Sequence, residues 1–165
     1  MAAGAPVSVE EYLKSSFNPN SEYVEGRVRP KSLPTKLHSL LEFMITVSLR
    51  QQGVEALAEL TVRLSATKYL IPDVVAAESL GEPYPTEPAM LCVEILSPED
   101  RLGAMFAKCE DYHAWGVPYC WVIDPVKQTG WQYDAQGEPV KVEPGGTLHA
   151  GKLAVNLGEL FTRQA

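Results

Sequence analysis

Ala89–Leu96, with the sequence AMLCVEIL, is nearly all apolar. A short apolar run of this kind is typical of a strand buried on both faces in the middle of a sheet. Ser97-Pro98-Glu99-Asp100 follows directly and predicts a helix start, with a capping Ser, a Pro in the first helical position and two acids at the positive end. We expect this helix to reach Trp115. Tyr119–Asp124 then predicts a second buried strand.

Alternating helical and strand patterns extend from this centre toward both ends of the chain. Thr35 begins an amphipathic helix that Gly53 closes, and Ser8 with Glu11 has the spacing of a capping box for a short helix. The remaining predicted strands are Glu22–Val28, Val54–Leu64, Tyr69–Ala77, Lys127–Tyr133, Pro139–Val142 and Leu153–Val155, with a last short helix over Leu157–Phe161. This order predicts an α/β fold with a mixed central sheet flanked by helices.

Composition limits the class of protein. The 165 residues suggest one domain over 1–165, and 45% hydrophobic with 21% charged residues is typical of a globular chain. Without an apolar run of about 20 residues or a visible signal peptide, we expect no membrane span and a cytoplasmic location. The net charge of −7 disfavours a surface that coats nucleic acid broadly, but a local basic groove, a metal ion or a homo-oligomer is compatible with it. The three scattered cysteines predict buried thiols.

Two acids stand in apolar surroundings. Glu94 lies inside the run that otherwise belongs in the core, and Asp73 lies between Pro72 and Val74 at the start of its own strand. Burying an ionised carboxylate costs several kcal/mol or more unless it is paired or binds a metal. If the two strands pair, their acids converge and offer oxygen ligands for Mg²⁺ or Mn²⁺. The alternative for each acid is a strand-end position with an ordinary salt bridge.

The chain resembles the Uma2 family of endonucleases, within the PD-(D/E)XK nuclease superfamily. The resemblance is carried, in order, by Pro72-Asp73, Val93-Glu94-Ile95-Leu96-Ser97-Pro98, Lys108, Tyr112, Gly116-Val117-Pro118 and Trp121-Val122-Ile123-Asp124-Pro125. It extends upstream to Glu22-Tyr23-Val24-Glu25-Gly26, His38 and Val62-Arg63-Leu64, and downstream to Leu157–Phe161. It covers nearly the whole chain and implies the restriction-endonuclease-like fold.

The resemblance implies that Asp73 and Glu94 are metal ligands. The superfamily usually carries a Lys two positions after the second acid, but this chain has Leu96 there. Lys108 matches the Lys that the related family supplies from the next helix. Its place at the border of the apolar helix face allows it to reach a carboxylate cluster, although a solvated Lys at a helix edge fits the same pattern.

Two further positions enter the expected site through the resemblance. Glu22 matches an acid that completes the site, and His38 would assist catalysis, orient Glu22 or serve a structural role near its helix end. A bound metal would polarise a phosphate and activate water, while Lys108 stabilises developing charge. The expected helix start at Ser97–Asp100 would aim backbone N–H groups at the same phosphate.

Three functions fit this pattern. The first is a metal-dependent endonuclease that hydrolyses phosphodiester bonds of nucleic acid, with DNA as the expected substrate. The second is a catalytically silent binding or assembly module on the same fold, which the acidic charge and Leu96 favour. The third is hydrolysis of a smaller phosphorylated substrate. Analogy with the superfamily predicts a homodimer or higher homo-oligomer.

Overall fold

The computed structural model describes residues 5–162, and its centre is a six-stranded sheet. The strand order is β10 (Val140–Val142), β9 (Thr129–Asp134), β8 (Tyr119–Asp124), β7 (Leu91–Ile95), β6 (Val74–Ala77) and β3 (Glu55–Ala58). β7 and β8 are parallel, and every other neighbouring pair is antiparallel. The predicted mixed α/β architecture is therefore confirmed, with the apolar run around Glu94 in the interior of the sheet.

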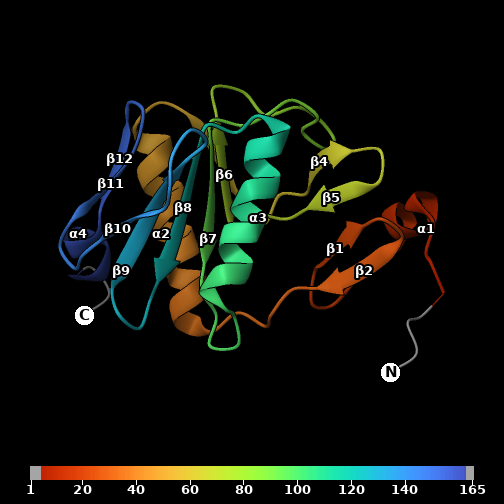
Figure 1. Cartoon of the computed structure of the whole chain (residues 1–165), viewed down its shortest axis with the longest axis horizontal. Coiled ribbons are helices and arrows are strands. Elements are labelled where there is room, and N and C mark those ends of the chain that lie inside the picture. The colour runs from red at the N-terminus through yellow and green to blue at the C-terminus, as the bar shows by residue number, and fades with distance from the viewer. Residues whose placement is uncertain (1–4, 163–165) are drawn as a thin grey trace.

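One long helix covers each face of this sheet (Figure 1). Side chains alternate between the faces of β7, so Leu91 and Val93 join the core under α2 (Lys36–Gln51), whereas Cys92 joins the core under α3 (Leu102–Trp115). α3 also connects the parallel strands β7 and β8. Glu94 follows Cys92 by two residues and therefore points to the α3 face of the sheet.

A second, four-stranded sheet stands beside the first (Figure 1). Its strands, in spatial order, are β2 (Arg27–Pro30), β1 (Ser21–Val24), β5 (Lys68–Leu70) and β4 (Val62–Ser65). The predicted capping box at Ser8 and Glu11 is present and begins α1 (Val9–Lys14). Tyr12 of this helix packs on Tyr23 and Tyr69, which attaches the N-terminal segment to the sheet.

The C-terminal part of the described chain extends the core under α2. A hairpin of β11 (Thr147–Ala150) and β12 (Leu153–Asn156) leads into α4 (Leu157–Thr162). Leu148, Leu153 and Leu157 are fully buried in the same cluster as the inner face of α2. Within residues 5–162, no helix combines the length and apolarity that crossing a membrane requires.

Four elements differ from the sequence predictions. The strands expected over Glu22–Val28 and Tyr69–Ala77 are each divided, the first into the hairpin of β1 and β2 and the second into β5 and β6 of different sheets. The strand expected over Val54–Leu64 is divided into β3 and β4, because Glu59 adopts a left-handed backbone conformation with φ 53° between them. The helix expected from Ser97 begins only at Leu102, since the Asp100 carboxylate accepts a hydrogen bond from the Ser97 N–H and closes a turn ahead of it. The helix terminus expected to face a phosphate at Ser97–Asp100 is therefore absent there.

Candidate functional site

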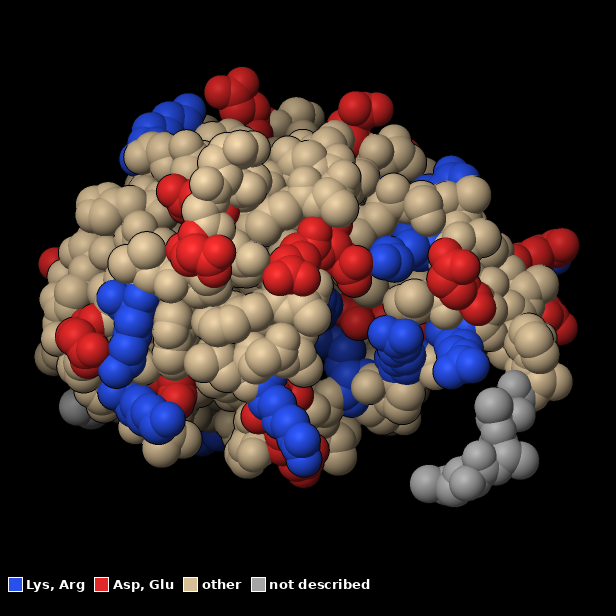
Figure 2. All heavy atoms as spheres, in the orientation of Figure 1, with Lys and Arg blue, Asp and Glu red and all other residues tan. Residues whose placement is uncertain are grey.

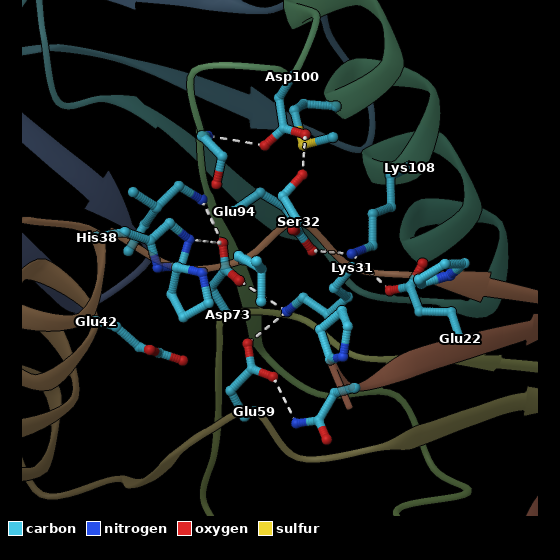
Figure 3. Close-up of a pocket in the computed structure, with 18 of the residues that line it drawn as sticks. Glu22, Lys31, Ser32, His38, Glu42, Glu59, Asp73, Glu94, Asp100 and Lys108 are labelled. Atoms are coloured by element: carbon cyan, nitrogen blue, oxygen red, sulfur yellow. Dashed lines mark hydrogen bonds and ion pairs between the residues drawn. The ribbon is translucent and has the colours of Figure 1, made fainter. Parts of the chain in front are cut away.

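One cleft collects all five residues that the sequence singled out. It has a volume of about 410 Å³ and lies where β1, the start of α2, the end of β7 and α3 meet. Figure 3 shows the side chains that point into it from these elements. The expected site residues on its lining are Glu22, His38, Asp73, Glu94 and Lys108.

Strand pairing brings the two strand acids together. β6 and β7 are antiparallel and their pairing ends with Val74 opposite Val93, so Asp73 and Glu94 are the next residues at this end of the two strands, and both line the cleft. Asp73 is 2% exposed and Glu94 is 3% exposed, so both carboxylates lie at the buried floor of the cleft.

Three donors surround the Asp73 carboxylate. Lys31 Nζ lies 2.8 Å from Oδ1, while His38 Nε2 at 3.2 Å and the Ile95 backbone N–H at 2.6 Å contact Oδ2. Burial opposes the charged form, but the hydrogen bond from His38 and the charge of Lys31 outweigh it and hold the pKa of Asp73 below its usual range. Asp73 is therefore a permanent negative charge.

Glu94 has a different environment on the α3 side. Its Oε1 accepts a hydrogen bond from the Tyr112 hydroxyl at 2.7 Å and lies 2.9 Å from Lys108 Nζ. Burial raises the pKa of Glu94 to about 7, although the Lys108 charge opposes this shift. Within residues 5–162, no hydrogen bond reaches Glu94 Oε2, so this oxygen is available to a ligand in the cleft.

Lys108 extends from α3 into the cleft, so it is not the solvated helix-edge Lys that the pattern also allowed. Its ammonium lies 2.7 Å from Glu22 Oε1 and 2.9 Å from Glu94 Oε1, and it donates to the Ile71 carbonyl at 3.3 Å. Burial alone would lower the pKa of Lys108, but Glu94 and Glu22 more than compensate and raise it. The cleft thus contains a fixed positive charge beside Glu94.

One expectation was that His38 orients Glu22, but the two side chains have different partners. Glu22 Oε1 accepts the Ile71 N–H at 2.8 Å and pairs with Lys108, whereas His38 contacts Asp73. The two residues therefore support different halves of the site: Glu22 orients Lys108, and His38 orients Asp73.

Lys31 is a site residue that the sequence analysis missed. It lies between β2 and α2, where no periodic pattern indicates the direction of its side chain. Its ammonium contacts Glu59 Oε1 at 2.6 Å, Asp73 Oδ1 at 2.8 Å and the Ile71 carbonyl at 2.9 Å. The sequence offers no local signal for this contact, because Lys31 and Asp73 are 42 residues apart along the chain.

A group of three carboxylates gathers beside Asp73. Glu42, Glu59 and Asp73 each offer an oxygen, and these oxygens all lie within 4.8 Å of one another. Burial, followed by the charges of Glu59 and Asp73, raises the pKa of Glu42 to about 7. Since carboxylate oxygens suit hard divalent cations, these three groups could hold such an ion. Glu42 and Glu59 escaped the sequence analysis because neither interrupts an apolar strand.

Both the sequence and the fold of this chain have matches among known proteins. The model of the Uma2 family, described as "Putative restriction endonuclease", matches residues 9–157. A crystal structure from Anabaena variabilis ATCC 29413, described as "a putative nuclease belonging to DUF820", is 24% identical and has a TM-score of 0.80. The alignment covers 95% of this chain and 98% of that one. This similarity confirms the predicted restriction-endonuclease-like fold.

Other comparisons add little. A cryo-EM structure of a DrdV-DNA complex is 16% identical to this chain, with a TM-score of 0.43, and the alignment covers 74% of this chain and 10% of that chain. None of the curated proteins matches the chain. The family match nevertheless extends over most of the chain and includes the whole cleft floor. The protein therefore belongs to the Uma2 family, the family described as "Putative restriction endonuclease".

Proposed function

We propose that this protein is a divalent-metal-dependent endonuclease that hydrolyses phosphodiester bonds of DNA. The observation that carries the proposal is that Asp73 and Glu94 lie together on the lining of one cleft, with the Lys108 ammonium 2.9 Å from Glu94. Two acids and a lysine at one buried point supply both the ligands and the positive charge that phosphodiester hydrolysis needs.

Asp73 and Glu94 are the proposed ligands of the metal, Mg²⁺ or Mn²⁺. Their oxygens fit such a cation because Asp73 is held in its charged form and Glu94 Oε2 faces the cleft without a partner among the described residues. A bound ion would polarise the scissile phosphate and acidify a water molecule. His38 and the Ile95 N–H hold the Asp73 carboxylate in one orientation for this purpose.

The remaining residues act on charge and position. Lys108 keeps its proton and offers a positive charge for the negative charge that develops on the phosphate. Glu22 fixes the direction of Lys108 and is itself fixed by the Ile71 N–H. Tyr112 donates to Glu94 and holds its other oxygen toward the cleft.

A row of basic residues supports nucleic acid as the substrate in preference to a small phosphate ester. Arg29 is opposite Glu22 in the β1–β2 pair, so it shares the cleft face of that hairpin, and Arg27, opposite Val24, lies on the same face. Both arginines are exposed. Figure 2 shows Lys and Arg side chains gathered around a hollow on this side of an otherwise mixed surface. Such a row can follow the phosphates of a strand into the cleft.

Nicking of supercoiled plasmid with Mg²⁺ or Mn²⁺ tests the proposal. We expect cleavage by the wild type and none by Asp73→Asn or Lys108→Met, with folding of each variant checked by circular dichroism. Arg29→Glu should weaken cleavage at low salt more than Lys141→Glu, which makes the same charge change on β10, and should make cleavage less dependent on salt, because a phosphate contact is lost. A wild type that binds DNA without cutting it under any metal condition would establish the silent binding module instead.

Two finer points belong to the same proposal. A homodimer or higher homo-oligomer is expected by analogy with the superfamily, and two-fold pairs are the commonest oligomers. Analytical ultracentrifugation of the full chain tests this point.

Metal-dependent hydrolysis of bis(p-nitrophenyl) phosphate without any cleavage of DNA would identify a small phosphorylated substrate in place of nucleic acid.

A further inference from the structure

Lys31 occupies the kind of position that a metal ion takes. Its ammonium is surrounded by three oxygens, namely Glu59 Oε1 at 2.6 Å, the Ile71 carbonyl at 2.9 Å and Asp73 Oδ1 at 2.8 Å. Figure 3 shows Lys31 between Asp73 and Glu59, reaching inward from the segment before α2. Two carboxylates and a carbonyl are the ligand types that hard cations use in proteins.

The charge at this position is incompletely balanced. Glu42 contributes a third carboxylate, its side chain is 9% exposed, and its Oε1 has no hydrogen-bond partner among the described residues. Figure 3 shows Glu42 extending from α2 toward Asp73 and Glu59. A buried carboxylate without a partner is costly, and such groups are normally paired or bind a metal. Lys31 pairs with Glu59 and Asp73, but no hydrogen bond or ion pair joins it to Glu42 among the described residues.

The spacing suits a larger charge in the same place. The oxygens of Glu42, Glu59 and Asp73 all lie within 4.8 Å of one another, which is about twice the length of a bond from oxygen to a divalent cation. Asn20 donates to Glu59 Oε2 at 3.0 Å and so leaves Oε1 directed at the position of the ammonium. The pocket is thus built to hold a cation and is filled by one from the chain itself.

We infer that Lys31 is a tethered cation that fills a divalent-metal pocket formed by Glu42, Glu59 and Asp73, and that a metal ion enters this pocket by displacing the Lys31 ammonium. The pocket shares Asp73 with the proposed Asp73–Glu94 site but needs no Glu94. The inference concerns ion exchange alone and is independent of any cleavage activity. It makes occupancy of the pocket depend on competition between Lys31 and the free metal.

Binding of Mn²⁺ without substrate, measured by the electron paramagnetic resonance of the free ion, gives the first test. Lys31→Met should bind a Mn²⁺ ion roughly tenfold or more tightly than the wild type does, because a positive charge at contact distance is removed. Lys36→Met is the matched control, since Lys36 is exposed and has no ion pair within residues 5–162. The double variant Lys31→Met/Glu42→Gln should lose the gain. Equal Mn²⁺ binding by wild type and Lys31→Met would overturn the inference.

A second measurement keeps Lys31 in place. Mass spectrometry of lysine acetylation should find faster modification of Lys31 when Mn²⁺ is added, whereas Lys36 should react at an unchanged rate. The effect should persist in Glu94→Gln, which removes a ligand of the proposed catalytic position only, and disappear in Glu42→Gln. Unchanged labelling of Lys31 at saturating Mn²⁺ would contradict ion exchange. Loss of the effect in Glu94→Gln alone would assign the ion to the Asp73–Glu94 position and reject the second pocket.

Discussion

Glu94→Gln tests the electrostatics of the cleft floor. Burial raises the pKa of Glu94 to about 7 from an ordinary value of 4.5, so between these pH values the folded protein holds a proton that the unfolded chain has lost. Stability must then fall as the pH rises from about 4.5 to about 7. Because each tenfold change in proton affinity is worth about 1.4 kcal/mol, the loss due to Glu94 is roughly 3 kcal/mol. Gln cannot titrate, so the variant lacks this contribution.

Urea denaturation at pH 5, 6, 7 and 8 without divalent metal measures the effect. The free energy of unfolding of wild type should fall relative to that of Glu94→Gln by roughly 2.5 kcal/mol across this range, since part of the full effect lies below pH 5. Glu99→Gln is a suitable control, since Glu99 is exposed and lies five residues away. Parallel pH profiles for wild type and Glu94→Gln would refute the reasoning, because they would mean that the buried carboxyl binds protons no more tightly than in the unfolded chain.

Three further predictions follow from the same structure. The affinity for Mn²⁺ should weaken as the pH falls below about 7, because protons compete for Glu94, and isothermal titration calorimetry at several pH values measures this. His38→Ala should cost about 1–3 kcal/mol at pH 6, measured by urea denaturation, because it removes a donor to charged Asp73. Because the pKa of Asp73 is lower in the folded protein than in the unfolded chain, its charge stabilises the fold at pH values above the unfolded pKa and does so less as the pH falls. The difference in unfolding free energy between wild type and His38→Ala should therefore shrink below about pH 4. Gly116→Ala should lower the free energy of unfolding by about 1–3 kcal/mol, since the φ of Gly116 is 121° and a Cβ there would lie 2.8 Å from Pro88 Cγ. Gly103→Ala in α3 should raise the free energy of unfolding by up to about 1 kcal/mol, because a Cβ at Gly103 would meet no atom within 4 Å.

Local patterns explain why much of the fold could be predicted. The apolar run of β7 needs burial on both faces, and a strand between two helices is the arrangement that supplies it. The capping box of α1 involves residues three positions apart, so it too is written in the local sequence. The break at Glu59 was missed because the residues on either side of it belong to different sheets, and a continuous β pattern does not record that change.

The candidate site, like the fold, could be predicted from the sequence only in part. Asp73 and Glu94 were recognisable because a charge inside an apolar strand is costly, and that cost is visible without a structure. The role of Lys31 was not, because the segment before α2 has no repeating pattern and its lysine meets Asp73 only after a separation of 42 residues along the chain is closed.

The amino-acid sequence alone thus determined the layered α/β fold and the two strand acids, since periodicity and the cost of buried charge are local properties. The tertiary structure decided which cationic side chains pair with those acids. It pairs Lys108 with Glu94 and Lys31 with Asp73, and it leaves Glu42 Oε1 without a hydrogen-bond partner among the described residues. Pairing of charges depends on distances of a few ångströms between segments remote in the chain, and only the folded arrangement sets those distances.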